Sequence, residues 1–254
     1  SQRRIKQHFM SKSVIIIPSR LAAKRLPNKP LIKINNKSLI MHVYEKAIRS
    51  NLGDVYVATC DKQIAEEVDK NGGRFIMTSS IHKSGTDRVH EACEKLNLQN
   101  IDHIINIQGD EPMINPEDIV NLNTVSKSNN FDFSTLAFTI KNKDDYTNKN
   151  IVKVLTNNKI SVSIASTARN FLRKIVHKND HLYHHYGVYM YKFSILKKFV
   201  KLNQSDNEKN ESLEQLRALD NKINIHVILA KHFSVGIDTK QDIDNYIKLI
   251  NKEI

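Results

Sequence analysis

Residues 104–114 read IINIQGDEPMI, an apolar strand pattern that runs directly into a turn at Gln108-Gly109-Asp110-Glu111-Pro112. Open α/β sheets hold their ligands at the carboxyl ends of their strands, which is where this turn lies. Gly109 has no Cβ, so the backbone can turn sharply or let a phosphate approach closely. Asp110 offers the hard oxygen ligand that Mg²⁺ takes when it shares a nucleotide phosphate. An isolated QGDEP is more often a strand-to-helix turn with a solvated acid, so its meaning depends on the rest of the chain.

Strand and helix patterns alternate through the first half of the chain, as short apolar runs bounded by turn residues. The expected strands are 14–17, 55–59, 74–77, 103–107 and 133–138, and the expected helices are 38–49, 61–71, 87–96 and 116–128. Asn115 followed by Pro116 is typical of a helix start. This alternation predicts an α/β fold with a mostly parallel central sheet and helices on both of its faces.

The second half of the chain is less regular. The expected strands are 151–155, 160–164, 186–191 and 225–229, and the expected helices are 194–200, 212–220 and 239–250. Segment 166–184 has weak periodicity and several histidines and basic residues, which favours a loop region. The polar tract 203–210 is interpreted as a surface linker.

A basic segment, PSRLAAKRLPNKP at 18–30, follows the first apolar run. Arg20, Lys24, Arg25 and Lys29 place four cations within ten residues, and three prolines prevent one regular helix. Arginine grips phosphate oxygens in pairs and lysine supplies a point charge, so the segment suits a triphosphate. The glycines of a Walker-type P-loop are missing. A solvated basic loop is the alternative interpretation.

Three more segments carry polar residues at helix ends. In HKSGTDR at 82–88, Ser84 or Thr86 can cap the following helix, whose free N–H groups would form an anion- or base-facing edge. In GIDTKQD at 236–242, Thr239 and Asp242 resemble a capping box, which leaves Asp238 free to ligate a metal. In ESLEQLR at 211–217, Glu211 and Gln215 are four residues apart and share one face of a predicted helix. Its leucines face inward, so an ordinary amphipathic helix without a functional role explains the segment equally well.

Seven segments in register give the chain a specific resemblance. They are PSRLAAKRLPNKPL at 18–31, HKSGTDR at 82–88, NIQGDEPMI at 106–114, NIVKV at 150–154, HYGVYMY at 185–191, ESLEQLRAL at 211–219 and GIDT at 236–239. On these segments the chain resembles the CMP-Kdo synthetases (3-deoxy-manno-octulosonate cytidylyltransferases), within the sugar-acid cytidylyltransferase family. The resemblance runs from about residue 13 to about residue 249. It implies a Rossmann-like nucleotidyltransferase fold over 14–254, with a small lobe from about 140–225 for the sugar site and a homodimer contact.

The resemblance also implies an activity, namely the transfer of CMP from CTP to the anomeric hydroxyl of Kdo for lipopolysaccharide biosynthesis, with release of pyrophosphate. It assigns catalysis to Lys29, Asp110 and Asp238, and one or two Mg²⁺ ions to Asp110 and Asp238. It assigns the nucleotide to Arg20, Arg25, Lys29, Ser84, Gly85 and Arg88. It assigns the sugar to Gln108, His185, Tyr189, Glu214 and Gln215.

The chain departs from the family pattern at three places. Lys24 replaces a small hydroxyl residue, and Asn28 replaces a glycine, a mild change because asparagine tolerates positive φ. At 166–171 the family carries a Ser-Arg pair, and the arginine for the sugar carboxylate is missing here in strict register. Arg169 lies two residues further on, so a short slip in a strand would return a cation to the same face. Alternatively Arg169 points to solvent, and Arg173 or Lys174 holds the carboxylate.

These departures leave other functions open. A cytidylyltransferase for a different acidic or amino sugar is one alternative, and a degenerate homologue or basic nucleic-acid-binding protein that keeps the fold is another. The formal charge of +12 could serve nucleic acid, but no helix-turn-helix, zinc-finger or aromatic RNA-binding pattern accompanies it. Anionic substrates together with compositional drift explain the charge better, so no nucleic-acid partner is expected.

The remaining composition favours a soluble cytoplasmic enzyme. Two cysteines, Cys60 and Cys93, do not form a disulfide framework, and Cys93 is expected to be a buried structural thiol. No apolar run is long enough for a signal sequence or a membrane span. Residues 1–13 are interpreted as a basic extension, either a natural terminus or a remnant of expression. His184 is expected at the surface or in an interface, because adjacent strand residues face opposite sides.

Overall fold

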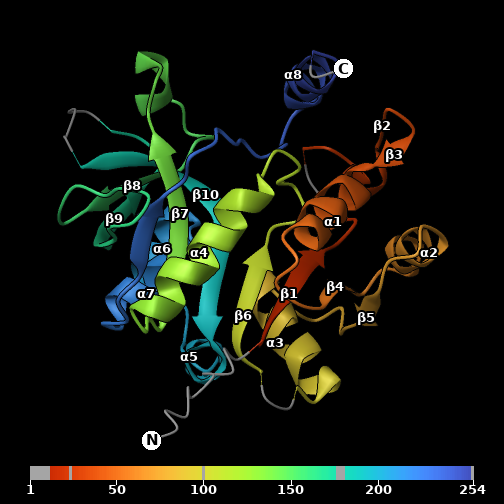
Figure 1. Cartoon of the computed structure of the whole chain (residues 1–254), viewed down its shortest axis with the longest axis horizontal. Helices are drawn as coiled ribbons and strands as arrows, with labels where there is room; N and C mark the ends of the chain where they lie inside the picture. Colours follow the sequence, from red (N-terminus) through yellow and green to blue (C-terminus); the bar gives the residue numbers. More distant parts are fainter. Residues whose placement is uncertain (1–11, 23–24, 99–100, 176–180, 253–254) are drawn as a thin grey trace, which may run out of the picture.

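The chain folds around a nine-stranded sheet with the strand order β5-β4-β1-β6-β10-β7-β11-β9-β8 (Figure 1). The structure is a computed structural model that describes residues 12–22, 25–98, 101–175 and 181–252. The strands are β1 (Lys12–Ser19), β4 (Val55–Thr59), β5 (Phe75–Met77), β6 (Ile101–Ile107), β7 (Phe133–Thr139), β8 (Lys153–Thr156), β9 (Ser166–Leu172), β10 (Leu182–Lys192) and β11 (His226–Leu229). A separate hairpin consists of β2 (Lys33–Ile34) and β3 (Lys37–Ser38).

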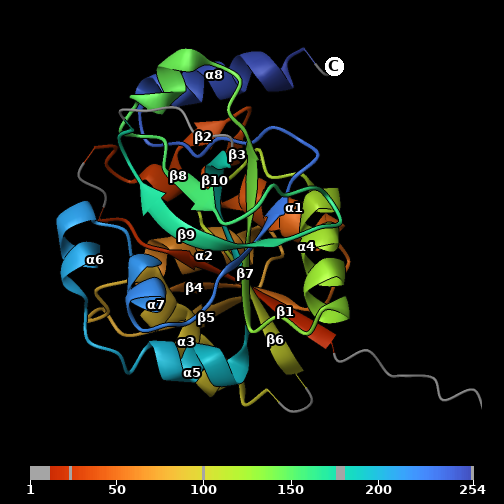
Figure 2. The same ribbon diagram turned by 90° about the vertical axis from the view of Figure 1, so that its left-hand side faces the viewer.

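Helices cover both faces of this sheet, as the sequence predicts (Figures 1 and 2). They are α1 (Leu39–Arg49), α2 (Lys62–Lys70), α3 (Gly85–Leu96), α4 (Pro116–Ser128), α5 (Phe193–Phe199), α6 (Asp206–Glu211), α7 (Leu216–Asp220) and α8 (Lys240–Ile250), with short 3-10 helices η1 (Lys29–Leu31) and η2 (Lys143–Tyr146). Figure 2 shows α4 on one side of β7 and α6 and α7 on the other.

The first strand explains why there are two layers of helices. Successive side chains of a strand face opposite sides, and all four apolar residues of β1 are fully buried. Ile15 and Ile17 pack in the core under α1, α2 and α4, whereas Val14 and Ile16 pack in the core under α3, α5 and α7. A continuous apolar run is therefore the expected sequence of a strand that is covered on both faces.

The sheet changes character at β10. Strands β5, β4, β1 and β6 pair in parallel, so the parallel arrangement holds in the first half of the chain. Strand β10 then pairs antiparallel with β6, β7 and β8. Because β8 also pairs with β9, β9 with β11, and β11 with β7, these five strands close a hydrogen-bonded ring. This ring lies in and beside the segment 140–225, for which a second lobe is expected.

Two predictions in the second half are wrong. The strand predicted at 160–164 is a turn, because the Ser161 hydroxyl accepts the backbone N–H groups of Ser163 and Ile164. The loop predicted at 166–184 contains β9 and the start of β10, and its part 176–180 lies outside the described residues. Small or polar inward-facing residues such as Ser166 and Ala168 give β9 no apolar alternation that periodicity could detect.

The predicted linker 203–210 is also wrong, since it contains the start of α6. Ser205 and Glu208 form a capping box, the S-x-x-E pattern that starts a helix. Ser212 has a left-handed φ of 53° and ends α6, so the helix predicted at 212–220 begins only at Leu216. The caps predicted from Ser84, Asn115 and Thr239 are confirmed.

The amino terminus of the fold begins before residue 14. Strand β1 starts at Lys12, and the buried Ser13 hydroxyl donates to Asn123 Oδ1 at 2.7 Å. The predicted extension 1–13 therefore overlaps β1 at its last two residues, and residues 1–11 lie outside the described part. Among the described residues, no helix is long and apolar enough to cross a membrane.

A buried ion pair between α6 and α7 gives a stability prediction. Arg217 donates to both carboxylate oxygens of Glu208 at 2.8 and 2.6 Å, and each side chain is only 5% exposed. Glu208→Ala leaves the guanidinium buried without its counter-ion, so the free energy of unfolding in a urea titration is expected to fall by about 3–5 kcal/mol. Lys209→Ala removes an exposed pair with Asp206 on the same helix and serves as the control. Equal losses in both variants would contradict the prediction.

Candidate active site

A cavity of about 1000 Å³ opens at the carboxyl ends of β1 and β6. All residues predicted for catalysis and for the nucleotide line this cavity, together with Gln108 from the predicted sugar set. The residues concerned are Arg20, Arg25, Lys29, Ser84, Gly85, Arg88, Asp110 and Asp238. They come from four separate segments, which only the sheet topology brings to one place.

The basic segment 18–30 forms one wall of the cavity. It leaves the end of β1, and the backbone N–H of Leu21 donates to Asp61 Oδ2 at 2.8 Å, which fixes its first turn. Asn28 has a φ of 55°, in the left-handed region that asparagine tolerates better than most residues. The substitution of glycine by asparagine is therefore conformationally mild, as predicted.

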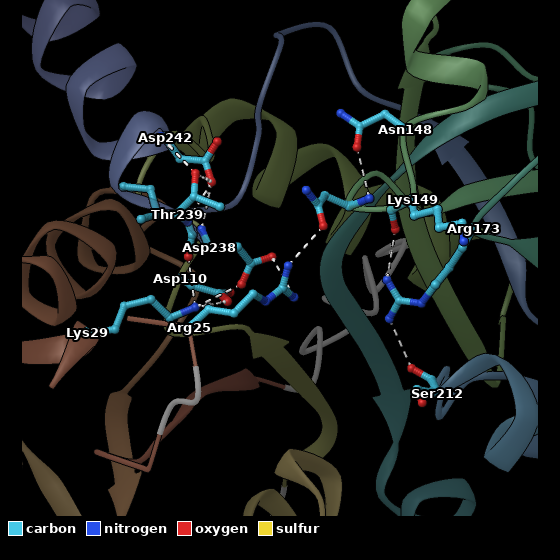
Figure 3. Close-up of polar contacts among 12 residues, drawn as sticks. Arg25, Lys29, Asp110, Asn148, Lys149, Arg173, Ser212, Asp238, Thr239 and Asp242 are labelled. Atoms are coloured by element: carbon cyan, nitrogen blue, oxygen red, sulfur yellow. Dashed lines mark hydrogen bonds and ion pairs between the residues drawn. The ribbon is translucent and has the colours of Figure 1, made fainter. Parts of the chain in front are cut away.

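Lys29 lies between the two predicted metal-binding carboxylates (Figure 3). Its Nζ donates to Asp110 Oδ2 at 2.9 Å, to Asp238 Oδ1 at 3.1 Å and to the carbonyl of Ile237 at 2.8 Å. These three acceptors use all three donors of an ammonium group. Burial alone would lower the pKa of Lys29, but the two carboxylates outweigh it and raise the pKa above its ordinary value. Lys29 is therefore a fixed cation within an oxygen-rich site.

The backbone around both carboxylates is tightly held. A Cβ at Gly109 would lie 3.1 Å from the carbonyl oxygen of Pro18, so the turn after β6 packs closely against the end of β1. On the other side, the Asp242 carboxylate accepts the backbone N–H of Asp238 at 3.0 Å and of Thr239 at 2.8 Å. Asp238 thus projects from the segment just before α8, as the capping pattern predicts.

The same oxygens could hold a divalent cation. Two carboxylates and the Ile237 carbonyl surround one position, now filled by the Lys29 ammonium, and oxygen donors of this kind suit Mg²⁺. The described residues contain no group of three or more histidine, cysteine, aspartate or glutamate side chains that could hold a metal. Mg²⁺ typically uses one or two carboxylates and completes its shell with phosphate and water, so the donor set fits this ion.

The start of α3 forms another wall. Ser84 caps the helix, accepting the backbone N–H of Asp87 at 3.2 Å, and Gly85 opens it. Arg88 is only 3% exposed and is held by the Thr78 hydroxyl and, at 3.2 Å, by the Ser79 carbonyl. A fixed guanidinium at a helix N-terminus favours the nucleoside or phosphate end of a nucleotide here.

Two residues near the cavity were not predicted. His82 lines the cavity, and its Nε2 is paired with Glu91. Burial opposes the charge of Glu91, but hydrogen bonds from Lys95, the Ser79 N–H and His82 hold its pKa at about 2. Glu111, next to Asp110, is buried and accepts from the N–H of Gly187 at 3.0 Å, while burial raises its pKa to about 7. His82 lies in the HKSGTDR segment and Glu111 in the QGDEP segment, so their place in these motifs could have marked them as site residues.

Of the other predicted sugar residues, a cluster of four that are buried or half-buried is not among the residues that line the cavity, namely His185, Tyr189, Glu214 and Gln215. His185 and Tyr189 have ring centroids 5.5 Å apart on β10, and the carbonyl of the intervening Gly187 accepts the backbone N–H of Gln108 at 3.0 Å. Gln215 is buried, and burial raises the pKa of the Glu214 carboxyl to about 7. Glu214 Oε1 has no hydrogen-bond partner within the described part of the chain, which suits a site for a polar ligand.

Arg169 is not brought to the cavity. It is exposed on β9, because Ser166 and Ala168 face inward and the alternate residues, Thr167 and Arg169, share the outer face. The predicted slip that would place it in the pocket is therefore wrong, and the solvent-facing alternative agrees with the structure. The guanidinium of Arg173 instead donates to three backbone carbonyls, those of Lys149, Glu211 and Ser212.

His184 is buried, only 7% exposed, so its predicted surface position is wrong. Its ring meets Tyr186 at 5.4 Å and Phe233 at 6.3 Å, and these neighbours cover it. His185 faces the other side, and its Nε2 lies 2.9 Å from the Thr135 hydroxyl. Cys93 is buried as predicted, and burial raises its pKa to about 12.

The two histidines give a pH prediction. Burial lowers the pKa of His184 from 6.5 to about 4 and that of His185 to about 3. As the pH falls below about 6.5, the unfolded chain takes up these protons first, so stability is expected to decrease from pH 6.5 toward pH 4. The urea midpoint at pH 7 and pH 5 measures the loss, which is expected to be smaller in His184→Gln. An unchanged pH dependence in that variant would contradict the assignment.

Sequence comparison identifies relatives along almost the whole chain. The cytidylyltransferase family profile matches residues 14–225. The 3-deoxy-manno-octulosonate cytidylyltransferase of Thermodesulfovibrio yellowstonii is 44% identical over 250 residues, which is 94% of this chain and 98% of the relative. The protein of the same name from Brucella canis is 39% identical over 235 residues, which is 92% of this chain and 93% of the relative.

Structural comparison agrees with these relatives. The structure of CMP:2-keto-3-deoxy-manno-octonic acid synthetase complexed with CTP has a TM-score of 0.85 and 35% identity, covering 96% of this chain and 100% of that one. A glucose-1-phosphate thymidylyltransferase structure from Bacillus anthracis has a TM-score of 0.63 at 12% identity over 94% of each chain, a likeness of fold alone. The predicted nucleotidyltransferase fold is confirmed.

Proposed function

Because the chain belongs to the cytidylyltransferase family, and within it to the 3-deoxy-manno-octulosonate cytidylyltransferases, we propose that it transfers CMP from CTP to Kdo for lipopolysaccharide biosynthesis. The anomeric oxygen of Kdo forms a bond to the α-phosphorus of CTP as the bond from that phosphorus to the β-bridging oxygen breaks. Pyrophosphate leaves, and the hydroxyl proton passes to solvent. The observation that carries the proposal is the convergence of Lys29, Asp110 and Asp238 in a cavity walled by cations.

Phosphoryl transfer of this kind needs alignment and charge neutralisation more than a dedicated base. Arg20, Arg25 and Lys29 line the cavity and supply positive charge for the triphosphate. Ser84, Gly85 and Arg88, at the start of α3, would hold the nucleoside end. The basic segment 18–30 and the start of α3 both line the cavity, so CTP would lie at the ends of β1 and β6.

Mg²⁺ is part of the proposal, with Asp110 and Asp238 as its protein ligands. When bound, the ion would lower the pKa of the attacking hydroxyl and align the α-phosphate. The paired carboxylates and the Ile237 carbonyl support this assignment by their chemistry. Lys29, displaced from between the carboxylates, would meet the charge of the leaving pyrophosphate.

The sugar would bind beside Gln108, against the cluster of His185, Tyr189, Glu214 and Gln215. A hydroxyl-rich ligand needs paired donors and acceptors, and the unpartnered Glu214 oxygen within the described residues is one of these. Because Arg169 faces solvent and Arg173 already holds three carbonyls, an acidic or amino sugar other than Kdo is the second candidate.

A pyrophosphate-release assay with CTP and Mg²⁺ tests the proposal. Kdo, amino-Kdo and sialic acid are compared as acceptors, and the fastest release is expected with Kdo. Faster release with amino-Kdo or sialic acid would move the substrate to the second candidate. Release with none of the three would overturn the proposed reaction.

The Arg169 position gives a prediction for the same assay. Since its side chain is exposed on the outer face of β9, Arg169→Ala is expected to leave the KM for the sugar and for CTP within about twofold of the starting values. Glu214→Gln, in the cluster of predicted sugar residues, is expected to raise the sugar KM clearly. A large rise in sugar KM confined to Arg169→Ala would restore the slipped-strand hypothesis.

A homodimer and a cytoplasmic location belong to the same proposal. Both described cysteines are free, which suits a reducing compartment. Light scattering on the purified chain would measure the oligomeric state. No nucleic acid or membrane partner is proposed.

A further inference from the structure

Arg25 meets a partner that no part of the proposed reaction includes (Figure 3). Its Nη1 donates to the side-chain oxygen of Asn150 at 2.9 Å, while its Nη2 lies 4.0 Å from Asp238 Oδ2. The Arg25 side chain is 57% exposed, so without a fixed acceptor it would sample many rotamers. Asn150 lies in the segment between η2 and β8, so this contact joins the basic segment to the part of the chain that begins the strand ring.

The segment that carries Asn150 is held by two cations. Lys153 Nζ donates to the carbonyl of Asn148 at 2.6 Å, and Arg173 Nη1 donates to the carbonyl of Lys149 at 3.2 Å. Within the segment, the N–H of Asn150 donates to Asn148 Oδ1 at 3.0 Å. Three consecutive residues are therefore each fixed by a hydrogen bond, and the last of them presents its amide to Arg25.

The side chain that holds the segment 148–150 from β8, Lys153, is a buried cation. The residue is 0% exposed, and its ammonium donates to two backbone carbonyls, those of Asn148 and, at 2.7 Å, of Arg173. Burial lowers its pKa to about 8, so it remains charged near neutral pH. Its hydrogen bonds go to carbonyls, although the Asp145 carboxylate is near enough to oppose the fall in pKa. Burying this ammonium destabilises the fold, whereas an apolar side chain would fill the space without that cost. Unlike an apolar side chain, the lysine fixes the positions of the Asn148 and Arg173 carbonyls by hydrogen bonds.

Arg173 extends the same arrangement to the rim of the cavity. Besides Lys149, its guanidinium binds the carbonyl of Glu211 at 2.9 Å and the carbonyl of Ser212 at 3.1 Å. Ser212 lines the cavity, and Figure 3 shows it joined to Arg173. Lys153 and Arg173 thus connect β8, the end of β9 and the end of α6 to the segment 148–150. Asn150, at the end of this segment, is hydrogen-bonded to Arg25.

We propose that Asn150 is a positioning residue for CTP binding, which orients Arg25 toward the triphosphate and is itself held in place by Lys153 and Arg173. The inference rests on the proposed function, because it takes CTP as the ligand of Arg25. An amide oxygen occupies one edge of the guanidinium and leaves its remaining N–H groups for phosphate oxygens. Affinity is gained because the side chain is ordered before the nucleotide arrives.

Isothermal titration of CTP, without sugar, tests this role directly. Asn150→Ala is expected to raise the Kd for CTP by about 2- to 10-fold, the range for ordering one long side chain. Arg25→Ala is expected to raise it further. The double variant is expected to match Arg25→Ala alone, because Asn150 acts only through that side chain. Asn142→Ala, an exposed asparagine in the same region, serves as the control and is expected to leave the Kd unchanged.

Lys153→Met tests the support behind Asn150 and is expected to raise the Kd for CTP in the same direction. If this variant does not fold, Asn150→Ala and the double variant still decide the question. An unchanged or tighter Kd in Asn150→Ala, or additive losses in the double variant, would overturn the inference while the proposed function stands. Absence of CTP binding in the unaltered protein would instead overturn the proposed function, and the inference with it.

Discussion

Asp238→Asn is expected to reduce turnover by about 10³-fold or more, and Asp110→Asn to do the same, with the fold intact. Each carboxylate lies within 3.1 Å of the Lys29 ammonium and would be shared with Mg²⁺. Replacing either by an amide removes one negative charge from the site while keeping the shape of the side chain. Both the alignment of the α-phosphate and the activation of the hydroxyl depend on that charge.

Steady-state pyrophosphate release measures the loss, and thermal unfolding shows whether each variant is folded. Asp244→Asn makes the same change on the exposed side of α8 and is expected to keep full activity. Mn²⁺ binding in the presence of CTP gives a readout apart from turnover, and both site variants are expected to bind Mn²⁺ more weakly. Near-normal activity in either one would contradict the shared-metal assignment.

Local patterns predict most of the elements because their causes are local. The two-sided burial of β1 follows from four consecutive apolar residues, and the caps at Ser84 and Thr239 follow from side chains that bind a backbone N–H three residues away. The strand β9 is not predicted, because inward residues such as Ser166 and Ala168 are small or polar and give no apolar alternation. The α6 helix was missed although its capping box, Ser205 and Glu208, is readable in the sequence.

The site divides in the same way. Motifs place Lys29, Asp110 and Asp238 at element ends, but their meeting depends on contacts between residues 81 and 209 positions apart. Arg169 shows what strand periodicity cannot predict. Residues two apart along a strand share a face, but the sequence does not say which face of β9 points inward. The Asn150 side chain is neither charged nor nucleophilic, so no motif marks it as a site residue. Its contact with Arg25 spans 125 positions, which local patterns do not predict.

Lys29→Met is expected to reduce turnover by about 10²-fold or more and, in the absence of CTP, to strengthen Mn²⁺ binding by about tenfold. The ammonium occupies the position between the carboxylates at which a divalent cation would bind, and all three of its donors are used there. A metal ion must therefore displace it, whereas a triphosphate offers it new acceptors. Removing the ammonium frees the carboxylates for metal but leaves the pyrophosphate charge unmet, so the two effects have opposite signs.

Arg25→Met is the matched control for the metal measurement, because it removes the same charge from a guanidinium 4.0 Å from Asp238 that does not lie between the carboxylates. Titration calorimetry or the Mn²⁺ electron paramagnetic resonance signal, without nucleotide, is expected to show a much smaller gain in affinity for this variant. Equal gains in both variants would mean that the net charge of the cavity, rather than occupation of the site by Lys29, limits metal binding. Unchanged Mn²⁺ affinity in Lys29→Met would show that the ion and the ammonium do not compete for the same oxygens.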